Sequence, residues 1–170
     1  MGLTIAPLAW YSIVNGLSCM ACHAQGMIPF TDEVRAGRTL LGFDEAARTA
    51  FKSTAWKVRP QSDRMGLRLA GPALTSQLPG EMVSEGVVFG SVQVPPNGQP
   101  IVLLADRQTL GGYLKIGHVI AVDLPQLAQV RPGDTVRFAE IPVAAAQMLA
   151  LELEKSLALL RMGVEARLQG

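Results

Sequence analysis

Val94-Pro-Pro-Asn-Gly-Gln-Pro100 is followed at once by the apolar run Ile101-Val-Leu-Leu-Ala105, and these two segments decide the fold. Asn97-Gly98 favours a tight turn with positive φ, and a short apolar run after such a turn is typical of a buried strand. The polar segment Asp106-Arg-Gln-Thr-Leu-Gly-Gly-Tyr113 comes next. Because binding residues often lie in segments that follow strands, we expect a functional site here.

Further short segments on both sides of this stretch also have the pattern of strands. Some alternate apolar and polar residues, and others are apolar runs bounded by glycine or proline. These segments are Trp56–Arg59, Gly66–Leu69, Gly86–Phe89, Tyr113–Ile116, His118–Val122 and Thr135–Phe138. Short strands separated by Pro, Gly and Asp turns must close or stack to bury one face each, which predicts a mainly β barrel or sandwich.

Two segments have helical character. In the first fifty residues, by contrast, the apolar residues recur with neither the period of a strand nor that of a helix. Asp44–Lys52 combines an acidic start with a basic end, and Val143–Arg161 is rich in Ala, Leu, Glu and Met. The second helix should have about five turns, with Met148, Leu151, Leu159 and Met162 on or near one stripe. We therefore expect an irregular N-terminal segment at 1–50, a candidate fusion, and a β-barrel lobe with a C-terminal helix at 51–170.

The composition is that of a globular protein without a strong electrostatic field. The 170 residues are 49% hydrophobic and have a net charge of +1. Scattered basic residues argue against nucleic acid as a partner, and the chain has no apolar run of the roughly 18 residues that a membrane span needs. The first residues make a weak secretory signal. We expect a cytoplasmic protein with neither nucleic acid nor membrane as partner.

Four stretches together resemble the carboxyltransferase-like family, over about residues 51–162. They are Trp56–Gly71, Ser84-Glu-Gly86, Val92–Tyr113 and Arg131-Pro-Gly-Asp134. This family includes proteins of the allophanate hydrolase subunit 2 type, the third subunit of bacterial ATP-dependent 5-oxoprolinase and the carboxyltransferase domain of urea carboxylase. The resemblance implies cyclophilin-like β-barrel lobes. The first half of the family domain has no match here, which predicts a truncated or fused member.

The resemblance also implies a function shared between chains. It suggests a subunit of an enzyme that opens 5-oxoproline to glutamate at the expense of ATP, acting with the other 5-oxoprolinase subunits; biotin-dependent carboxyl transfer in urea metabolism is the sister possibility. The sequence contains neither a P-loop nor a Met-Lys biotin attachment site. ATP is therefore expected to be held by unfamiliar geometry or by a partner, and biotin to arrive on a separate domain. A non-catalytic module that binds partner subunits is a further possibility.

The candidate catalytic residues are Arg107, Asp106 and Gln108, directly after the predicted strand. A guanidinium can bind a carboxylate or phosphate through two hydrogen bonds, and Asp106 could orient it. Gln108 could pair with a lactam or ureido group, because both are planar amides with a donor and an acceptor. A local ion pair at a strand end and a surface glutamine are the structural alternatives.

The candidate substrate-binding residues surround this group: Gln99, Gly111, Gly112, Tyr113 and Lys115. The glycines would allow a ligand to approach the backbone or would simply form a turn. Tyr113 and Lys115 lie on one face of a strand, although a half-buried tyrosine and a solvated lysine are common.

Two further polar groups are interpreted as structural. Ser62-Asp63-Arg64 should hold a turn through side-chain hydrogen bonds to the backbone. His118 begins an apolar strand without a carboxylate nearby in sequence, so we interpret it as a hydrogen-bonded histidine and not as a general base.

Cys19-Met-Ala-Cys22-His23 has the C-x-x-C-H spacing of c-type haem attachment. Residues 14–38 resemble the haem-attachment stretch of bacterial c-type cytochromes, and Met27, Met65 or Met82 would be the candidate sixth ligand. Such attachment, as that resemblance implies, happens after export, which conflicts with a cytoplasmic protein. A disulfide, a zinc site with further ligands and two inert thiols are the alternatives.

Overall fold

The computed structural model describes residues 3–4, 8–9, 42–78 and 83–168, and the predicted haem-attachment residues lie outside this part. Its main element is a nine-stranded sheet with the order β1-β10-β3-β4-β7-β6-β9-β2-β11. The strands are β1 (Leu3–Thr4), β2 (Leu8–Ala9), β3 (Trp56–Val58), β4 (Gly66–Ala70), β6 (Ser91–Val94), β7 (Ile101–Leu103), β9 (Leu114–His118), β10 (Thr135–Arg137) and β11 (Glu140–Ile141). A separate two-stranded sheet pairs β5 (Glu85–Gly86) with β8 (Leu110–Gly111).

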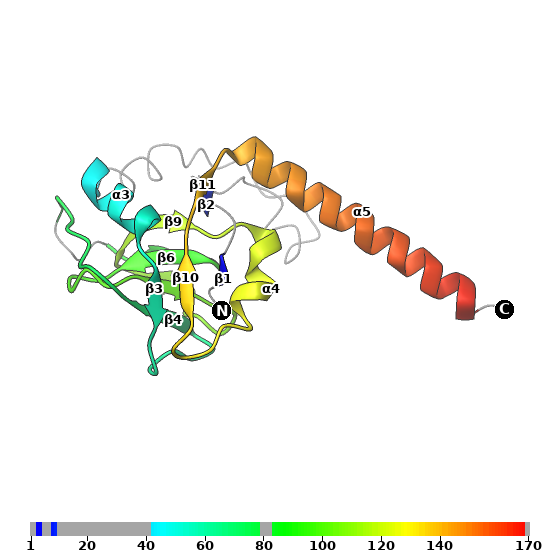
Figure 1. Cartoon of the computed structure of the whole chain (residues 1–170), viewed down its shortest axis with the longest axis horizontal. Coiled ribbons are helices and arrows are strands. Elements are labelled where there is room, and N and C mark those ends of the chain that lie inside the picture. Colours follow the sequence, from blue (N-terminus) through cyan, green and yellow to red (C-terminus); the bar gives the residue numbers. More distant parts are fainter. Residues whose placement is uncertain (1–2, 5–7, 10–41, 79–82, 169–170) are drawn as a thin grey trace.

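The curved sheet forms most of the lobe in Figure 1. It encloses an apolar core. Alternate residues of the strands face inward, as the period of two requires. In the central strands the inward residues are Leu67, Leu69, Val92, Val94, Val102, Leu114 and Ile116, all buried. The predicted mainly β fold with a C-terminal helix is confirmed.

Helix α3 (Glu45–Ser53) closes one side of this core. Asp44 caps it, because its Oδ1 accepts a hydrogen bond from the backbone N–H of Ala47 at 2.8 Å. Phe51 stacks on Phe138 with ring centroids 4.6 Å apart, and the indole N–H of Trp56 donates to the Phe51 carbonyl at 2.9 Å. The helix predicted at 44–52 is therefore confirmed, and it packs on the strands.

Two predicted strands are wrong, and their buried apolar residues, Val87, Val119 and Ile120, are buried for another reason. Of Gly86–Phe89 only Gly86 is in a strand; the backbone then turns, and Gly90 adopts φ +90° before β6 begins. His118–Val122 is also not a separate strand. His118 ends β9, and η1 (Ala121–Asp123) leads into the short helix α4 (Leu124–Leu127). A short apolar run does not by itself distinguish a strand from a buried turn.

Helix α5 (Val143–Leu168) follows β11 and extends away from the lobe (Figure 1). It has 26 residues, continues beyond the predicted end at Arg161, and has no buried residue. The division into 1–50 and 51–170 stays a prediction, although Phe43 and Ala47 pack in the same core as the strands.

Candidate functional site

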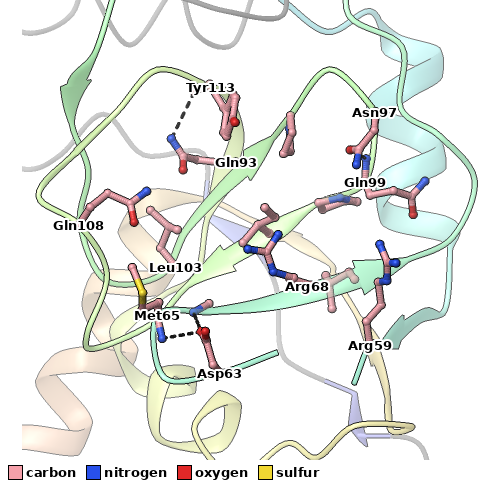
Figure 2. Close-up of a pocket in the computed structure, with 15 residues that line it drawn as sticks. Arg59, Asp63, Met65, Arg68, Gln93, Asn97, Gln99, Leu103, Gln108 and Tyr113 are labelled. Atoms are coloured by element: carbon pink, nitrogen blue, oxygen red, sulfur yellow. Dashed lines mark hydrogen bonds between the residues drawn. The ribbon is translucent and has the colours of Figure 1, made fainter. Parts of the chain in front are cut away.

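A cavity of about 320 Å³ lies on the outer face of the sheet, opposite the apolar core. It is formed by residues of β4, β6 and β7, by the turn between β3 and β4, and by the segments before β7, β8 and β9. Its walls consist of Arg59, Asp63, Met65, Gly66, Arg68, Leu69, Gln93, Pro95, Asn97, Gln99, Pro100, Ile101, Leu103, Gln108 and Tyr113. Many of these side chains are polar, and Figure 2 shows how they surround the space.

A row of side chains across three neighbouring strands forms the floor of the cavity. Arg68 on β4 and Gln93 on β6 are both register partners of Ile101 on β7. Register partners lie side by side on one face of a sheet, at about 5 Å between neighbouring Cα atoms. Strand pairing thus places a guanidinium and an amide on one face of the sheet, on either side of Ile101, although they are far apart in sequence.

Two arginines give the cavity its positive charge. Neither Arg59 nor Arg68 forms an ion pair with any residue in the described part of the chain. The only carboxylate among the wall residues belongs to Asp63, whose Oδ1 accepts hydrogen bonds from the backbone N–H groups of Met65 at 2.9 Å and Gly66 at 3.1 Å. The wall therefore has two guanidinium groups against one carboxylate, and none of the three forms an ion pair within the described ranges. This net positive charge favours an anion as ligand.

The predicted structural role of Ser62-Asp63-Arg64 is confirmed. Besides the two bonds to Asp63, the Ser62 hydroxyl accepts a hydrogen bond from the backbone N–H of Arg68 at 3.0 Å. This turn therefore fixes the start of β4, the strand that positions Arg68.

Gln93 is the buried polar side chain of the site, with 1% of its surface exposed. Its Nε2 donates a long hydrogen bond of 3.5 Å to the carbonyl of Tyr113, which fixes the direction of the amide (Figure 2). Gly111 packs against this amide: a Cβ there would lie 2.5 Å from Gln93 Nε2. Position 111 must therefore be glycine to leave room for the Gln93 amide. Gly111 itself does not line the cavity.

Gln99 lines the cavity, but both polar atoms of its amide form hydrogen bonds with the backbone of Gly71. Its Oε1 accepts from the backbone N–H of Gly71 and its Nε2 donates to the Gly71 carbonyl, both at 3.1 Å. Asn97 supports it through a turn in which Asn97 Oδ1 accepts from the backbone N–H of Gln99 at 3.0 Å. Gln99 therefore clamps two loops at one end of the cavity.

Gln99, Gln108 and Tyr113 are the predicted site residues that line the cavity, and the structure places the others outside it. Asp106 forms an exposed ion pair with Arg64, with 2.9 Å between Oδ2 and Nε. Arg107 Nη1 makes a long hydrogen bond of 3.4 Å to the Ala105 carbonyl, and its Nε is buried without a partner in the described part. Gly112 does not line the cavity either.

Lys115 is in the same row as Gln93 but is bound elsewhere. Its Nζ lies 2.9 Å from Glu85 Oε1 and donates to the Gly86 carbonyl at 3.1 Å. Lys115 therefore attaches the small β5–β8 sheet to β9. The catalytic and substrate-binding roles given to all these residues stay predictions.

His118 is neutral at physiological pH. Its pKa is lowered to about 4, first by burial and then by the positive charges of Lys115 and Arg107. A group with so low a pKa binds a proton only weakly near pH 7, which agrees with the interpretation that His118 is not a general base. Its hydrogen bonding stays a prediction.

The described ranges contain no cluster of typical metal ligands. No three or more His, Cys, Asp or Glu side chains within them are grouped so that they could hold a metal ion. Among the described helices, none combines the length and the apolar character required to traverse a bilayer.

Sequence reasoning missed Arg59, Arg68, Gln93 and Asn97. For Arg68 a signal was present, because Gly66-Leu-Arg-Leu69 alternates and so places the arginine opposite two leucines. Ser91-Val-Gln-Val94 alternates in the same way but is only four residues long. The strand register that pairs both Arg68 and Gln93 with Ile101 cannot be predicted from the sequence of β4 or β6 alone.

Fold and site together define a mainly β half-barrel domain with a cationic, amide-lined cavity on the outer face of its sheet. The chain belongs to the family described as carboxyltransferase domain, subdomain A and B, whose model matches residues 23–140.

Known relatives support this assignment. The chain is 44% identical over 124 residues to the C subunit of 5-oxoprolinase from Haemophilus influenzae, covering 72% of this chain and 40% of that protein. It is 45% identical over 98 residues to the Escherichia coli protein of the same name, covering 58% and 32%. The crystal structure of Kluyveromyces lactis urea carboxylase superimposes with a TM-score of 0.64 at 26% identity, over 68% of this chain and 11% of that one. The chain thus spans less than half the length of these relatives.

Proposed function

We propose that this chain takes part in ATP-dependent hydrolysis of 5-oxoproline to glutamate, and that its cavity binds the substrate. The observation that favours this function is the pair of arginines, Arg59 and Arg68, which line the same cavity as Gln93 and Gln108 and have no ion-pair partner in the described ranges. The 44–45% identity to two proteins named as the C subunit of 5-oxoprolinase supports the same reaction.

The chemistry of 5-oxoproline fits the groups in the cavity. The molecule has a carboxylate, which a guanidinium binds through two charge-assisted hydrogen bonds. It also has a lactam, whose N–H and C=O match the acceptor and donor of a glutamine amide. We assign the carboxylate to Arg68 and Arg59, and the lactam to Gln93 and Gln108.

Ring opening would need groups from other chains. The carboxylate of Asp63 is held by its turn, and the sequence has no P-loop for nucleotide phosphates. Both relatives are named as one subunit of 5-oxoprolinase, which supports an assembly with further subunits of that enzyme. In this proposal the chain binds and orients the substrate, while ATP is held by a partner.

Biotin-dependent carboxyl transfer is the second candidate, because of the structural match to urea carboxylase. The ureido ring of biotin is also a planar amide and would use Gln93 and Gln108. Biotin attached to a separate domain has no free carboxylate, since that group forms the linkage. Arg59 and Arg68 would then bind the carboxyl group in transfer, so the two candidates differ in the ligand and not in the residues.

The test compares Arg68→Gln with Arg64→Gln. Arg64 is a matched control, because it is nearby, exposed, and paired with Asp106 away from the cavity wall. Calorimetry measures 5-oxoproline binding to the full chain, and ADP release is measured in a mixture with the other 5-oxoprolinase subunits. Loss of a charge-assisted hydrogen bond should weaken binding roughly tenfold or more for Arg68→Gln, and Arg64→Gln should behave as wild type.

Arg107→Ala completes the comparison. We expect it to leave binding within about twofold of wild type, since Arg107 lies outside the cavity. If Arg107→Ala abolished 5-oxoproline-dependent ADP release while Arg68→Gln did not change it, the assignment of the cavity would be wrong. Binding of a biotin amide but not of 5-oxoproline would favour carboxyl transfer.

A further inference from the structure

Helix α5 exposes an unusual amount of apolar surface. None of its residues is buried, and ten large apolar side chains are exposed along it: Met148, Leu149, Leu151, Leu153, Leu157, Leu159, Leu160, Met162, Val164 and Leu168. Solvent-exposed helices of soluble proteins normally have one apolar stripe that faces a core. Apolar surface of this extent marks a contact with another molecule.

Six of these side chains form one continuous stripe, which we call the leucine stripe. They follow one another in steps of four, four, three, four and four residues: Leu149, Leu153, Leu157, Leu160, Val164 and Leu168. Because an α-helix has 3.6 residues per turn, such steps keep the side chains on one side of the helix. At 1.5 Å per residue the stripe is about 28 Å long.

The spacing of the leucine stripe is the same in both directions along the helix. Two copies of α5 in antiparallel orientation can therefore match every member of the stripe. Leu157 of one copy lies opposite Leu160 of the other, Leu153 opposite Val164, and Leu149 opposite Leu168. A two-fold axis generates this contact, in which both copies use the same surface.

Charges beside the stripe are complementary in the same orientation. Glu154 and Arg161 lie along one edge of the stripe, and Glu152 and Arg167 lie on the opposite side. In the antiparallel pair Glu154 approaches Arg161 of the other copy, and Glu152 approaches Arg167. In a parallel pair each of these residues would meet a like charge.

The remaining apolar residues are less suited to such a contact. Met148, Leu151, Leu159 and Met162 also lie near one line, but Lys155 is in its middle, four residues from each leucine. An antiparallel pair through this line would place Lys155 against itself. The absence of any charged residue within the leucine stripe favours it over this second line.

We propose that the leucine stripe of α5 binds a second copy of this chain, as an antiparallel helix pair. This inference does not depend on the proposed function. Light scattering coupled to size-exclusion chromatography tests it on the full chain, with a reducing agent to exclude a disulfide through Cys19 or Cys22. We expect twice the chain mass of 18.1 kDa.

Two apolar variants distinguish the leucine stripe from the rest of the helix. Leu157→Glu places a charge at the centre of the proposed contact and should give the monomer mass. Leu159→Glu is the matched control, because Leu159 is 69% exposed and lies on the other side of the helix. It should keep the dimer mass, while far-ultraviolet circular dichroism confirms that both variants retain helix α5.

Charge exchange tests the orientation. Arg161→Glu should raise the dimer dissociation constant about tenfold, because each dimer contains the lost pair twice. Adding Glu154→Arg restores opposite charges and should return the constant to within about threefold of wild type. A wild-type monomer at the highest soluble concentration would overturn the proposal, as would a dimer that survives Leu157→Glu. A complex that forms only with a different 5-oxoprolinase chain would overturn it as well.

Discussion

At the scale of single residues, the best-defined requirement is a glycine at position 111. Its missing side chain leaves room for the buried amide of Gln93, because a Cβ there would lie 2.5 Å from Gln93 Nε2. We predict that Gly111→Ala lowers the free energy of unfolding by about 1–3 kcal/mol, the usual cost of overpacking. Urea unfolding measures it.

Gly86→Ala is the matched control for this substitution. Gly86 is in β5, directly opposite Leu110 in β8, and a Cβ there would meet nothing within 4 Å. Its stability should equal that of wild type or slightly exceed it, since alanine restricts the unfolded chain. Equal losses in the two variants would contradict the role given to Gln93.

The buried position of His118 makes stability depend on pH. Its pKa of about 4 in the folded chain is below the ordinary value of 6.5, so the unfolded chain binds more protons between these values. We predict that the free energy of unfolding decreases as pH falls from 6.5 to 4, by up to about 3 kcal/mol. Lys115 and Arg107 contribute to this effect through their charges.

The measurement compares wild type with His118→Gln by urea unfolding across this pH range. The variant cannot take up the proton, so the difference between the two proteins should change by that amount between pH 6.5 and 4. A difference that stays constant with pH would show that His118 titrates normally in the folded chain.

At the scale of elements, the sequence determines local structure well and the pairing between elements poorly. The acidic start of α3 is predicted correctly, because Asp44 caps the helix that follows it. The alternation in β4 places Arg68 on the outer face, again a local property. The end of β9 at His118 was missed, because the apolar residues after it are buried by packing and not by strand pairing.

The candidate site illustrates the same division. Gln99, Gln108 and Tyr113 follow or precede strands and are predicted from their position in the sequence, and all three line the cavity. Arg107 and Asp106 belong to the same segment, but the backbone turns their side chains to other partners. Gln93 is recognised as part of the site only from the register of β6 against β7. Residue types indicate which ligands a segment could bind, but strand pairing determines which side chains lie in the same cavity.

At the scale of the whole molecule, the lobe and helix α5 are energetically distinct. The lobe has its own core of buried side chains, which includes residues of α3 and of the sheet, whereas α5 contributes none. The cavity is formed by residues between Arg59 and Tyr113, all in the lobe. The proposed substrate binding and the proposed chain association therefore belong to separate parts of the chain.

This separation predicts the effect of removing α5 beyond its first turn. A chain that ends at Met148 keeps β11 and the ion pair between Lys52 and Glu140, with 3.0 Å between Nζ and Oε2. Because no buried side chain is lost, the free energy of unfolding per chain should change by no more than about 0.5 kcal/mol. Tryptophan fluorescence in urea, at a concentration where wild type is monomeric, measures this change. The shortened chain should bind 5-oxoproline as wild type does yet stay monomeric at all concentrations; if it unfolded, α5 would be a structural part of the lobe.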